Sequence, residues 1–331
     1  MPETPDTWDS TDRQIAAVLQ ISGRASWGAV SRLLDLPERT IARRGQRLID
    51  RGAVKVSTYL DVRSIQESRS IVIRMRVSAD RVRPVAAEVA RRADASSVSV
   101  LEGARQIVAL LILPDPSKIA QVVLDELPAI EGVLSCEAMT VLRWYRSGYD
   151  WMMTNTISPE VRAAAQAEIH AALDEDAAPV TDLTEQDQQL IELLAEEGRM
   201  PATRLADLIG AKTAVVRRRV EQLIASGTLR VRAEVAPGVF GLRIEAMVWL
   251  RVPPGQIDEM GRILAASGEV RFCSAVTGEY QMMVDMLARS EEQLLEFLSG
   301  AVSRVPGARV GEVDLVLAPV RRGPLTMIDE D

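Results

Sequence analysis

The sequence repeats itself, and this constrains the fold more than any other feature. When the 331-residue chain is shifted by 175 positions, from Asp12 to Asp187, identical residues coincide without a gap over about 140 residues. Each element predicted for one copy is therefore expected in the other, and surfaces that two molecules would bury can pair within one chain. The coincident positions in the first copy are Asp12, Gly23-Arg24, Leu33, Arg43-Arg44, Leu48-Ile49, Gly52, Val56, Gly103, Gly132, Leu142 and Arg146.

Each copy opens with three short helical patterns. In the first copy Ser10-Thr11-Asp12 is suited to the N-cap of the first helix, Trp27–Leu34 carries a second apolar stripe, and Pro37 opens the third helix. The second copy repeats this pattern from Asp187 to Ile224. Three helices of this size with a tight turn before the last predict a helix-turn-helix domain in each copy.

The third helix of each copy presents arginines and hydroxyls on the face opposite its apolar stripe. Arginine can bridge phosphates or bind guanine, and short hydroxyls reach the DNA backbone, so these residues are the predicted DNA contacts. The whole chain has a net charge of −8, but Pro37–Val56 holds six bases against two acids and Lys212–Val231 five against one. The predicted contacts are Arg39, Thr40, Arg43, Arg44, Arg47, Thr213, Arg217, Arg218 and Arg219.

After each third helix the pattern changes to strands and two further helices. One strand is predicted at Val54–Leu60 and its equivalent at Leu229–Val235, each followed by a βαββαβ pattern typical of a ferredoxin-like antiparallel sheet. The fold class is therefore α+β, with two winged-type three-helix domains alternating with two ferredoxin-like domains. The predicted domains are 1–62 (helix-turn-helix), 63–147 (ferredoxin-like), 148–181 (acidic helical linker), 182–237 (helix-turn-helix), 238–322 (ferredoxin-like) and 323–331 (acidic tail).

The composition excludes several other classes. Catalytic triads, Cys/His dyads and multi-histidine metal sites all need histidine, and His170 is the only one, within the predicted linker helix. Two cysteines are too few for a disulfide framework or a cysteine-rich zinc site. Seven residues, Ile107–Leu113, form the longest apolar run, and the N-terminus resembles no secretory signal. We therefore expect a cytoplasmic protein with no catalytic residues, no metal, no cofactor and no membrane contact.

These motifs resemble the Lrp/AsnC family of bacterial transcription regulators, over essentially the whole chain twice. The first copy carries Asp12-Arg13-Gln14-Ile15, Gly23-Arg24-Ala25-Ser26-Trp27 and Leu48-Ile49-Asp50-Arg51-Gly52, and the second keeps Gly198-Arg199 and Arg218-Arg219. The resemblance implies a sequence-specific regulator of double-stranded DNA, associated with the nucleoid. It also implies that the two ferredoxin-like domains pair face to face as an intramolecular pseudo-dimer, from which homo-oligomers are built.

The resemblance further implies a small-molecule effector, such as an amino acid, near the turn between the second and third strands of each βαββαβ module. The candidate effector residues are Gly103, Gln106, Gly278, Tyr280 and Gln281. The family usually has aspartate where this chain has Gln106 and Gln281. A neutral amide cannot form the ion pair that a carboxylate makes with an α-ammonium group, and a plain β-hairpin with glycine at positive φ also explains these residues.

Two other functions remain open. Siroheme decarboxylases resemble the same layout and also occur as fused pairs, although they are expected to use a pocket histidine. A metabolite-binding protein that does not bind DNA is the third alternative. An absorption spectrum with siroheme tests the decarboxylase, and a band-shift assay tests the metabolite-binding protein that does not bind DNA.

Overall fold

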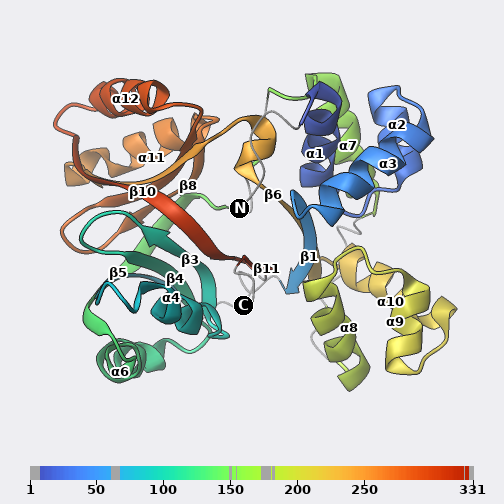
Figure 1. Cartoon of the computed structure of the whole chain (residues 1–331), viewed down its shortest axis with the longest axis horizontal. Helices are drawn as coiled ribbons and strands as arrows, with labels where there is room; N and C mark the ends of the chain where they lie inside the picture. Colours follow the sequence, from blue (N-terminus) through green and yellow to red (C-terminus); the bar gives the residue numbers. More distant parts are fainter. Residues whose placement is uncertain are drawn as a thin grey trace. The chain divides into compact units, whose positions relative to one another are not determined.

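The computed structural model describes residues 8–60, 68–148, 151–153, 155–172, 180, 183–323 and 325–327. The chain divides into two compact units, each built from both sequence copies (Figure 1). The first unit, Met1–Asp61 with Met152–Phe240, contains both helix-turn-helix domains and is called the head unit here. The second, Val62–Trp151 with Gly241–Asp331, contains both βαββαβ modules and is called the sheet unit.

The head unit contains the two predicted sets of three helices. Each first helix has a reciprocal cap, in which Asp9 pairs with Asp12 and Thr184 with Asp187. The cap of the first helix is thus Asp9, one residue before the predicted Ser10-Thr11-Asp12. The elements are α1 (Ser10–Ile21), α2 (Trp27–Leu34), α3 (Glu38–Asp50) and β1 (Val54–Leu60), then α8 (Glu185–Glu196), α9 (Ala202–Ile209), α10 (Thr213–Ala225) and β6 (Leu229–Val235).

The strands β1 and β6 pair with each other along their whole length. Val54 lies opposite Val235 and Leu60 opposite Leu229, so the register is symmetric about the pair Ser57 and Arg232, which are themselves equivalent in the repeat. This corrects the winged-type prediction. A wing is a hairpin within one domain, whereas here each strand obtains its hydrogen bonds from the equivalent strand of the other domain.

Reciprocal contacts reinforce this pairing. Helix α1 packs on β6 and α8 packs on β1. The side chain of Arg24 donates to the Gly198 carbonyl, while Arg199 donates to the carbonyls of Gly23 (2.7 Å) and Ala25 (2.9 Å). The Gly-Arg motifs of the two copies therefore connect the two domains. Burial lowers the pKa of Arg199 to about 10, with the nearby charge of Arg24 acting in the same direction.

The predicted linker contributes one helix to the head unit. Helix α7 (Pro159–Ala172) packs against α1 and α2 and buries Ala165 completely. It contacts the first helix-turn-helix domain, so the two domains differ in their surroundings as well as in their sequences. The backbone of His170 belongs to this helix.

The sheet unit contains both predicted βαββαβ modules. The first is β2 (Arg69–Val77), α4 (Val82–Ala90), β3 (Ala95–Leu101), β4 (Ile107–Leu113), α5 (Ile119–Gln121), α6 (Leu127–Ala129) and β5 (Val133–Arg146). The second is β7 (Ile244–Arg251), α11 (Ile257–Ala266), β8 (Val270–Val276), β9 (Met282–Ala288), α12 (Glu291–Gly300) and β10 (Arg309–Arg322). The helical segment from Pro116 to Ala129 is not one continuous α-helix, because a π turn at Val122–Glu126 interrupts it just before Pro128, which has no N–H to donate.

The last strand of each module is shared between the modules. Strand β5 pairs with β2 through residues 133–140 and with β8 through residues 141–146. Strand β10 pairs with β7 through residues 309–315 and with β3 through residues 316–322. The strand order β10-β3-β4-β2-β5-β8-β9-β7 therefore closes on itself through the pairing of β10 with β7, so one continuous sheet replaces the two separate sheets predicted.

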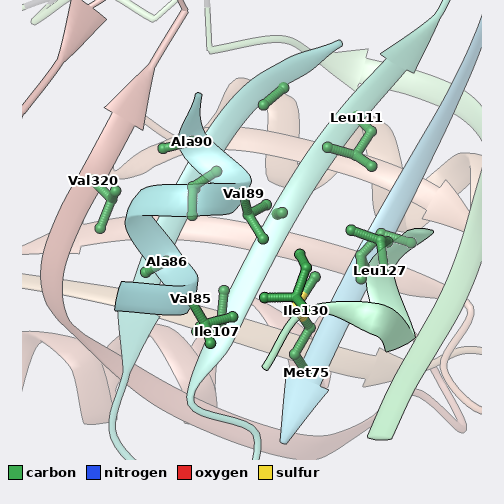
Figure 2. Packing of buried hydrophobic residues seen from close by; sticks show 14 of the residues in the cluster. Met75, Val85, Ala86, Val89, Ala90, Ile107, Leu111, Leu127, Ile130 and Val320 are labelled. Atoms are coloured by element: carbon green, nitrogen blue, oxygen red, sulfur yellow. The ribbon is translucent and has the colours of Figure 1, made fainter. Parts of the chain in front are cut away.

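The sheet has a helix-covered face in each module and a common interior. The first module packs α4 and α6 against one apolar cluster, and Figure 2 shows Val85, Val89 and Leu127 in it. The second module has an equivalent cluster, and a third contains Leu101, Met139 and Trp249 from both modules. Within the predicted acidic tail, Leu325–Thr326 forms β11 on the end of β10, and residues 324 and 328–331 lie outside the described residues.

A substitution in the Gly-Arg motif tests the pairing of the two heads. A Cβ atom at position 198 would lie 2.7 Å from the backbone of Ser57, so we expect Gly198→Ala to destabilise the head unit by about 1–3 kcal/mol. The equivalent Gly23→Ala is the control, since its Cβ would meet only side-chain methyl groups of Val231 and Val56 at 3.1 Å. Thermal unfolding of both variants measures the difference, and equal effects would contradict this account.

Candidate nucleic-acid interface

The structure divides the predicted DNA contacts into two groups. The first group is directed to solvent. On α3, Arg39 and Arg43 are exposed and Thr40 is partly so, whereas on α10 the exposed pair is Arg217 and Arg218. Thr213 stands at the first position of α10 and is partly buried. These side chains are therefore free to contact a polyanion such as the DNA backbone.

The second group is bound within its own domain. Arg44 lies 3.0 Å from the carboxylate of Asp12, and its equivalent Arg219 makes two contacts of 2.7 Å with Asp187. Both aspartates are buried and also belong to the helix caps of α1 and α8. The same ion pair thus fixes the third helix to the first in both domains. The Arg219 guanidinium holds the pKa of Asp187 far below its usual range.

Arg47 belongs to this bound group in the first domain alone. Its guanidinium lies 2.6 Å from Asp12 and 5.1 Å from the centre of the Trp8 ring. The second domain has Gln222 at the equivalent position, where it accepts a hydrogen bond from Arg219. Three of the nine predicted contacts therefore have a structural partner, and the signal for this was present in the sequence as the coincidence of Asp12 with Asp187.

The turns before the third helices have the conformation that a helix-turn-helix needs. Helix α2 ends at Asp35 in the left-handed region (φ 52°), and α9 ends at Gly210 (φ 67°). Asp35 is the only residue other than glycine with positive φ in the part of the chain that the structure describes. Aspartate tolerates this conformation better than most residues, so the tight turn is retained in both copies.

The structure brings the predicted effector residues together within each βαββαβ hairpin. The side-chain oxygen of Gln106 accepts from the backbone N–H of Val77 (3.0 Å), and its equivalent Gln281 accepts from Val252 (3.1 Å). Both glutamines therefore tie the hairpin to the end of the first strand in its module. A neutral amide performs this task in both copies.

The glycines of these hairpins lie against the other module. Gly103 (φ 96°) leaves room for Asp314, and Gly278 (φ 104°) for Met139. Tyr280 is buried, and its hydroxyl lies 3.1 Å from the carboxylate of Glu312. Sequence reasoning placed these residues correctly at turns but did not identify their partners, which come from β5 and β10.

Ligand groups, helix lengths and cysteine environments of the described residues bear on metal sites, membrane-spanning helices and reactive thiols, respectively. No group of three or more potential metal ligands occurs among residues that the structure describes. Within the same ranges, no helix is both long and apolar enough to cross a membrane. Burial raises the pKa of both cysteine thiols, that of Cys273 to about 12, so neither is activated as a nucleophile.

Comparison with known proteins agrees with this geometry. The family model for the AsnC-type helix-turn-helix domain matches residues 9–49 and 183–224, and that for the Lrp/AsnC ligand binding domain matches residues 245–325. The HTH-type transcriptional regulator FL11 of Pyrococcus furiosus is 27% identical over 124 residues, which are 37% of this chain and 82% of that protein. The HTH-type transcriptional regulator LrpA of Pyrococcus horikoshii is 24% identical over 38% of this chain and 89% of its own length.

One solved structure resembles the whole chain. The siroheme decarboxylase NirDL superimposes with a TM-score of 0.58 over 97% of this chain and 95% of its own, at 15% sequence identity. This likeness concerns the fold alone. The fold and the matched domains define a helix-turn-helix regulator with ligand-binding-type sheet domains. The chain thus carries the AsnC-type helix-turn-helix domain twice, together with the Lrp/AsnC ligand binding domain.

The buried ion pair predicts an acid-sensitive head. Because the pKa of Asp187 is lowered in the folded state, its stabilising contribution is present above the ordinary carboxylate pKa and is lost as the pH falls below it. We expect Asp187→Asn to destabilise the head unit by about 1–2 kcal/mol at pH 7, since Arg219 is partly exposed, and to weaken the fall in stability below about pH 4.

Unfolding midpoints measured from pH 7 to pH 2 test this prediction. Asp207→Asn is the matched control, because Asp207 is an exposed carboxylate on α9 of the same domain. If both variants follow the wild-type pH profile, the ion pair with Arg219 does not contribute to stability.

Proposed function

We propose that this protein is a sequence-specific DNA-binding transcription regulator whose two heads contact one DNA segment. The main support is a repeated arrangement: exposed Arg43 and Arg218 stand at equivalent positions beside the ion-paired Arg44 and Arg219. The pairing of β1 with β6 joins the two heads. A DNA-binding role also agrees with the two matches to the AsnC-type helix-turn-helix domain, and such a protein would act at the nucleoid in the cytoplasm.

Neutralising the exposed arginines tests DNA binding directly. We expect Arg43→Ala and Arg218→Ala to weaken binding without changing thermal stability, because neither side chain belongs to the ion pairs. If an arginine contacts phosphate, the dependence of log K on log salt should fall by about one; if it contacts a base, discrimination at one position should fall by roughly 1–3 kcal/mol.

A charge-matched control separates a local contact from a general charge effect. Arg83→Ala removes an exposed arginine on α4 of the sheet unit and should leave affinity unchanged. Band shifts on the upstream region of the protein's own gene, at several salt concentrations, provide the measurement. Wild-type affinity in both head variants would refute the proposed interface.

The two heads should differ in how they recognise DNA. Glu38-Arg39-Thr40 at the start of α3 corresponds to Thr213-Ala214-Val215 on α10, where Val215 is 59% exposed. The first head can therefore make charged and hydroxyl contacts to bases, whereas the second depends more on Arg217 and Arg218 and the phosphate backbone.

An asymmetric operator follows from this difference. We expect footprinting to show one well-defined half-site and one degenerate half-site for each chain, with Arg43→Ala altering the first and Arg218→Ala the second. The expected asymmetry would disappear if chains assembled further and paired identical heads across a two-fold axis. A palindromic site lost equally in both variants, at one chain per site, would contradict the asymmetric arrangement.

The sheet unit supports the internal pairing. We propose that its two modules are the counterpart of a homodimer within one chain, because the shared strands have matching registers. Val141 lies opposite Val276, and its equivalent Val316 lies opposite Leu101, the equivalent of Val276. Such pseudo-dimers are also the units from which we expect homo-oligomers to form, and mass determination in solution tests this.

A small-molecule effector is a further part of the proposal. The ligand binding domain match in the second module supports it, and the hairpins of Gly103 and Gly278 are the candidate positions. Because Gln106 and Gln281 bind backbone N–H groups, an amino-acid effector would need a different partner for its ammonium group. Thermal shift with the common amino acids tests this, and no shift with any of them would exclude that class.

The siroheme decarboxylase alternative is kept because of the whole-chain fold likeness to NirDL. The only histidine in the sequence, His170, lies in α7 of the head unit rather than in a βαββαβ module. We therefore expect no spectral change when siroheme is added to the protein. A stoichiometric shift of the siroheme absorption bands would favour the enzyme. The DNA-inert alternative is excluded by any specific band shift.

A further inference from the structure

Where the two modules meet inside the sheet unit, equivalent positions of the repeat hold different side chains. Arg74 of β2 and Trp249 of β7 are equivalent in the repeat, and both are buried. The guanidinium of Arg74 lies over the Trp249 ring, 4.2 Å from its centre. A pair of equivalent positions therefore holds a cation on one side and an aromatic ring on the other.

Three acids neutralise Arg74, and the two nearest come from the second module, since Glu137 of the first module lies 3.9 Å away. Glu312 lies 2.7 Å and Asp314 3.5 Å from Arg74, and the indole N–H of Trp249 donates to Asp314 (3.3 Å). The equivalents of these acids in the first module are Glu137 and Met139. Only the second module thus supplies an aspartate at this place. Burial raises the pKa of Asp314, an effect that the nearby Arg74 opposes.

A second contact between the modules is unequal in size. Tyr145 of β5 covers Gly261 of α11 so closely that a Cβ atom at position 261 would overlap its ring. At the equivalent place, β10 packs on α4, and Val320 and Ala86 belong to one apolar cluster, in which Figure 2 labels both. A large side chain against glycine on one side corresponds to a smaller side chain against alanine on the other.

We propose that the two modules recognise each other as unlike partners, so that the first pairs with the second and neither pairs with its own kind. The proposal depends on the internal pairing described above but not on DNA binding. The repeat makes it possible to state what each like pair would contain, since every contact residue has a known equivalent.

Two first modules would not fit together. Arg74 would face a second Arg74 in a buried interior. Glu137 would stand in place of Glu312 but Met139 in place of Asp314, so each arginine would lose one of its carboxylates, and two buried like charges repel strongly. Tyr145 would also meet Ala86 instead of Gly261. Both the charge and the volume of this like pair are unfavourable.

Two second modules would fail for opposite reasons. Asp314 would be buried without Arg74, so the Trp249 N–H would remain but no cation would balance the carboxylate in an apolar interior. Val320 would lie against Gly261 and leave a void where Tyr145 now packs. The interface therefore accepts one arrangement, first module with second, whether the two belong to one chain or are exchanged between two.

Variants of the full chain test the charge contact. Trp249→Arg with Asp314→Met gives the second module the residues of the first, and we expect the unfolding midpoint of the sheet unit to fall by about 10 °C. Adding Arg74→Trp and Met139→Asp moves the whole arrangement to the equivalent positions. This fourfold exchange should recover at least half of the lost stability. We do not expect full recovery, because Tyr280 lies beside Arg74 in the wild type, whereas its equivalent Arg105 would lie beside the new arginine at position 249.

The size contact provides an independent test. Gly261→Ala should lower the midpoint through overlap with Tyr145, and adding Tyr145→Val should restore it by reproducing the contact of Ala86 with Val320. Loss and recovery in both sets support the proposal. It is overturned if the Trp249→Arg, Asp314→Met variant keeps the wild-type midpoint, or if neither exchange recovers stability. Band shifts on the recovered variants report DNA binding separately, so a failure of the regulator proposal would be seen as such.

Discussion

The structure depends on strand edges that are unpaired within one sequence copy and are hydrogen-bonded by strands of the other copy. Strand β1 has β6 as its partner, while the second halves of β5 and β10 pair with strands of the opposite module. An unpaired edge exposes a row of backbone donors and acceptors, which is costly when buried and prone to association when exposed. Because every one of these pairings joins two copies, the duplicated chain satisfies edges that a single copy would present to another molecule.

The sequence predicted the elements well because both copies report the same hydrophobic periods. The strand bounds of β1 and β6 agree with the structure, and the βαββαβ order holds in both modules. It could not predict which strands pair across the copies, since alternation gives the buried face of a strand but not its neighbour. The winged-type prediction was therefore wrong, and no pattern in the sequence indicated that β10 continues past its pairing with β7 to pair with β3 as far as Arg322.

The candidate site was predicted only in part for a related reason. Periodicity places Arg43 and Arg44 both off the apolar stripe of α3, yet one is exposed and the other is bound to Asp12. The difference arises from the packing of α1 against α3, which no pattern within α3 contains. The coincidence of aspartate and arginine at a constant shift was a usable signal, because two positions retained together in both copies are suited to contact each other.

In this molecule the backbone pairing is symmetric, whereas the side chains at equivalent positions differ, and the two features have different consequences. Matching registers at the shared strands keep the two modules in one geometry, while unequal pairs such as Arg74 with Trp249 distinguish the modules chemically. In the heads, the reciprocal Gly-Arg contacts are retained in both copies, whereas the exposed starts of α3 and α10 differ. Fusion makes this division possible, because a residue in one copy can change without its equivalent changing at the same interface. A homodimer cannot place arginine on one side of its axis and tryptophan on the other.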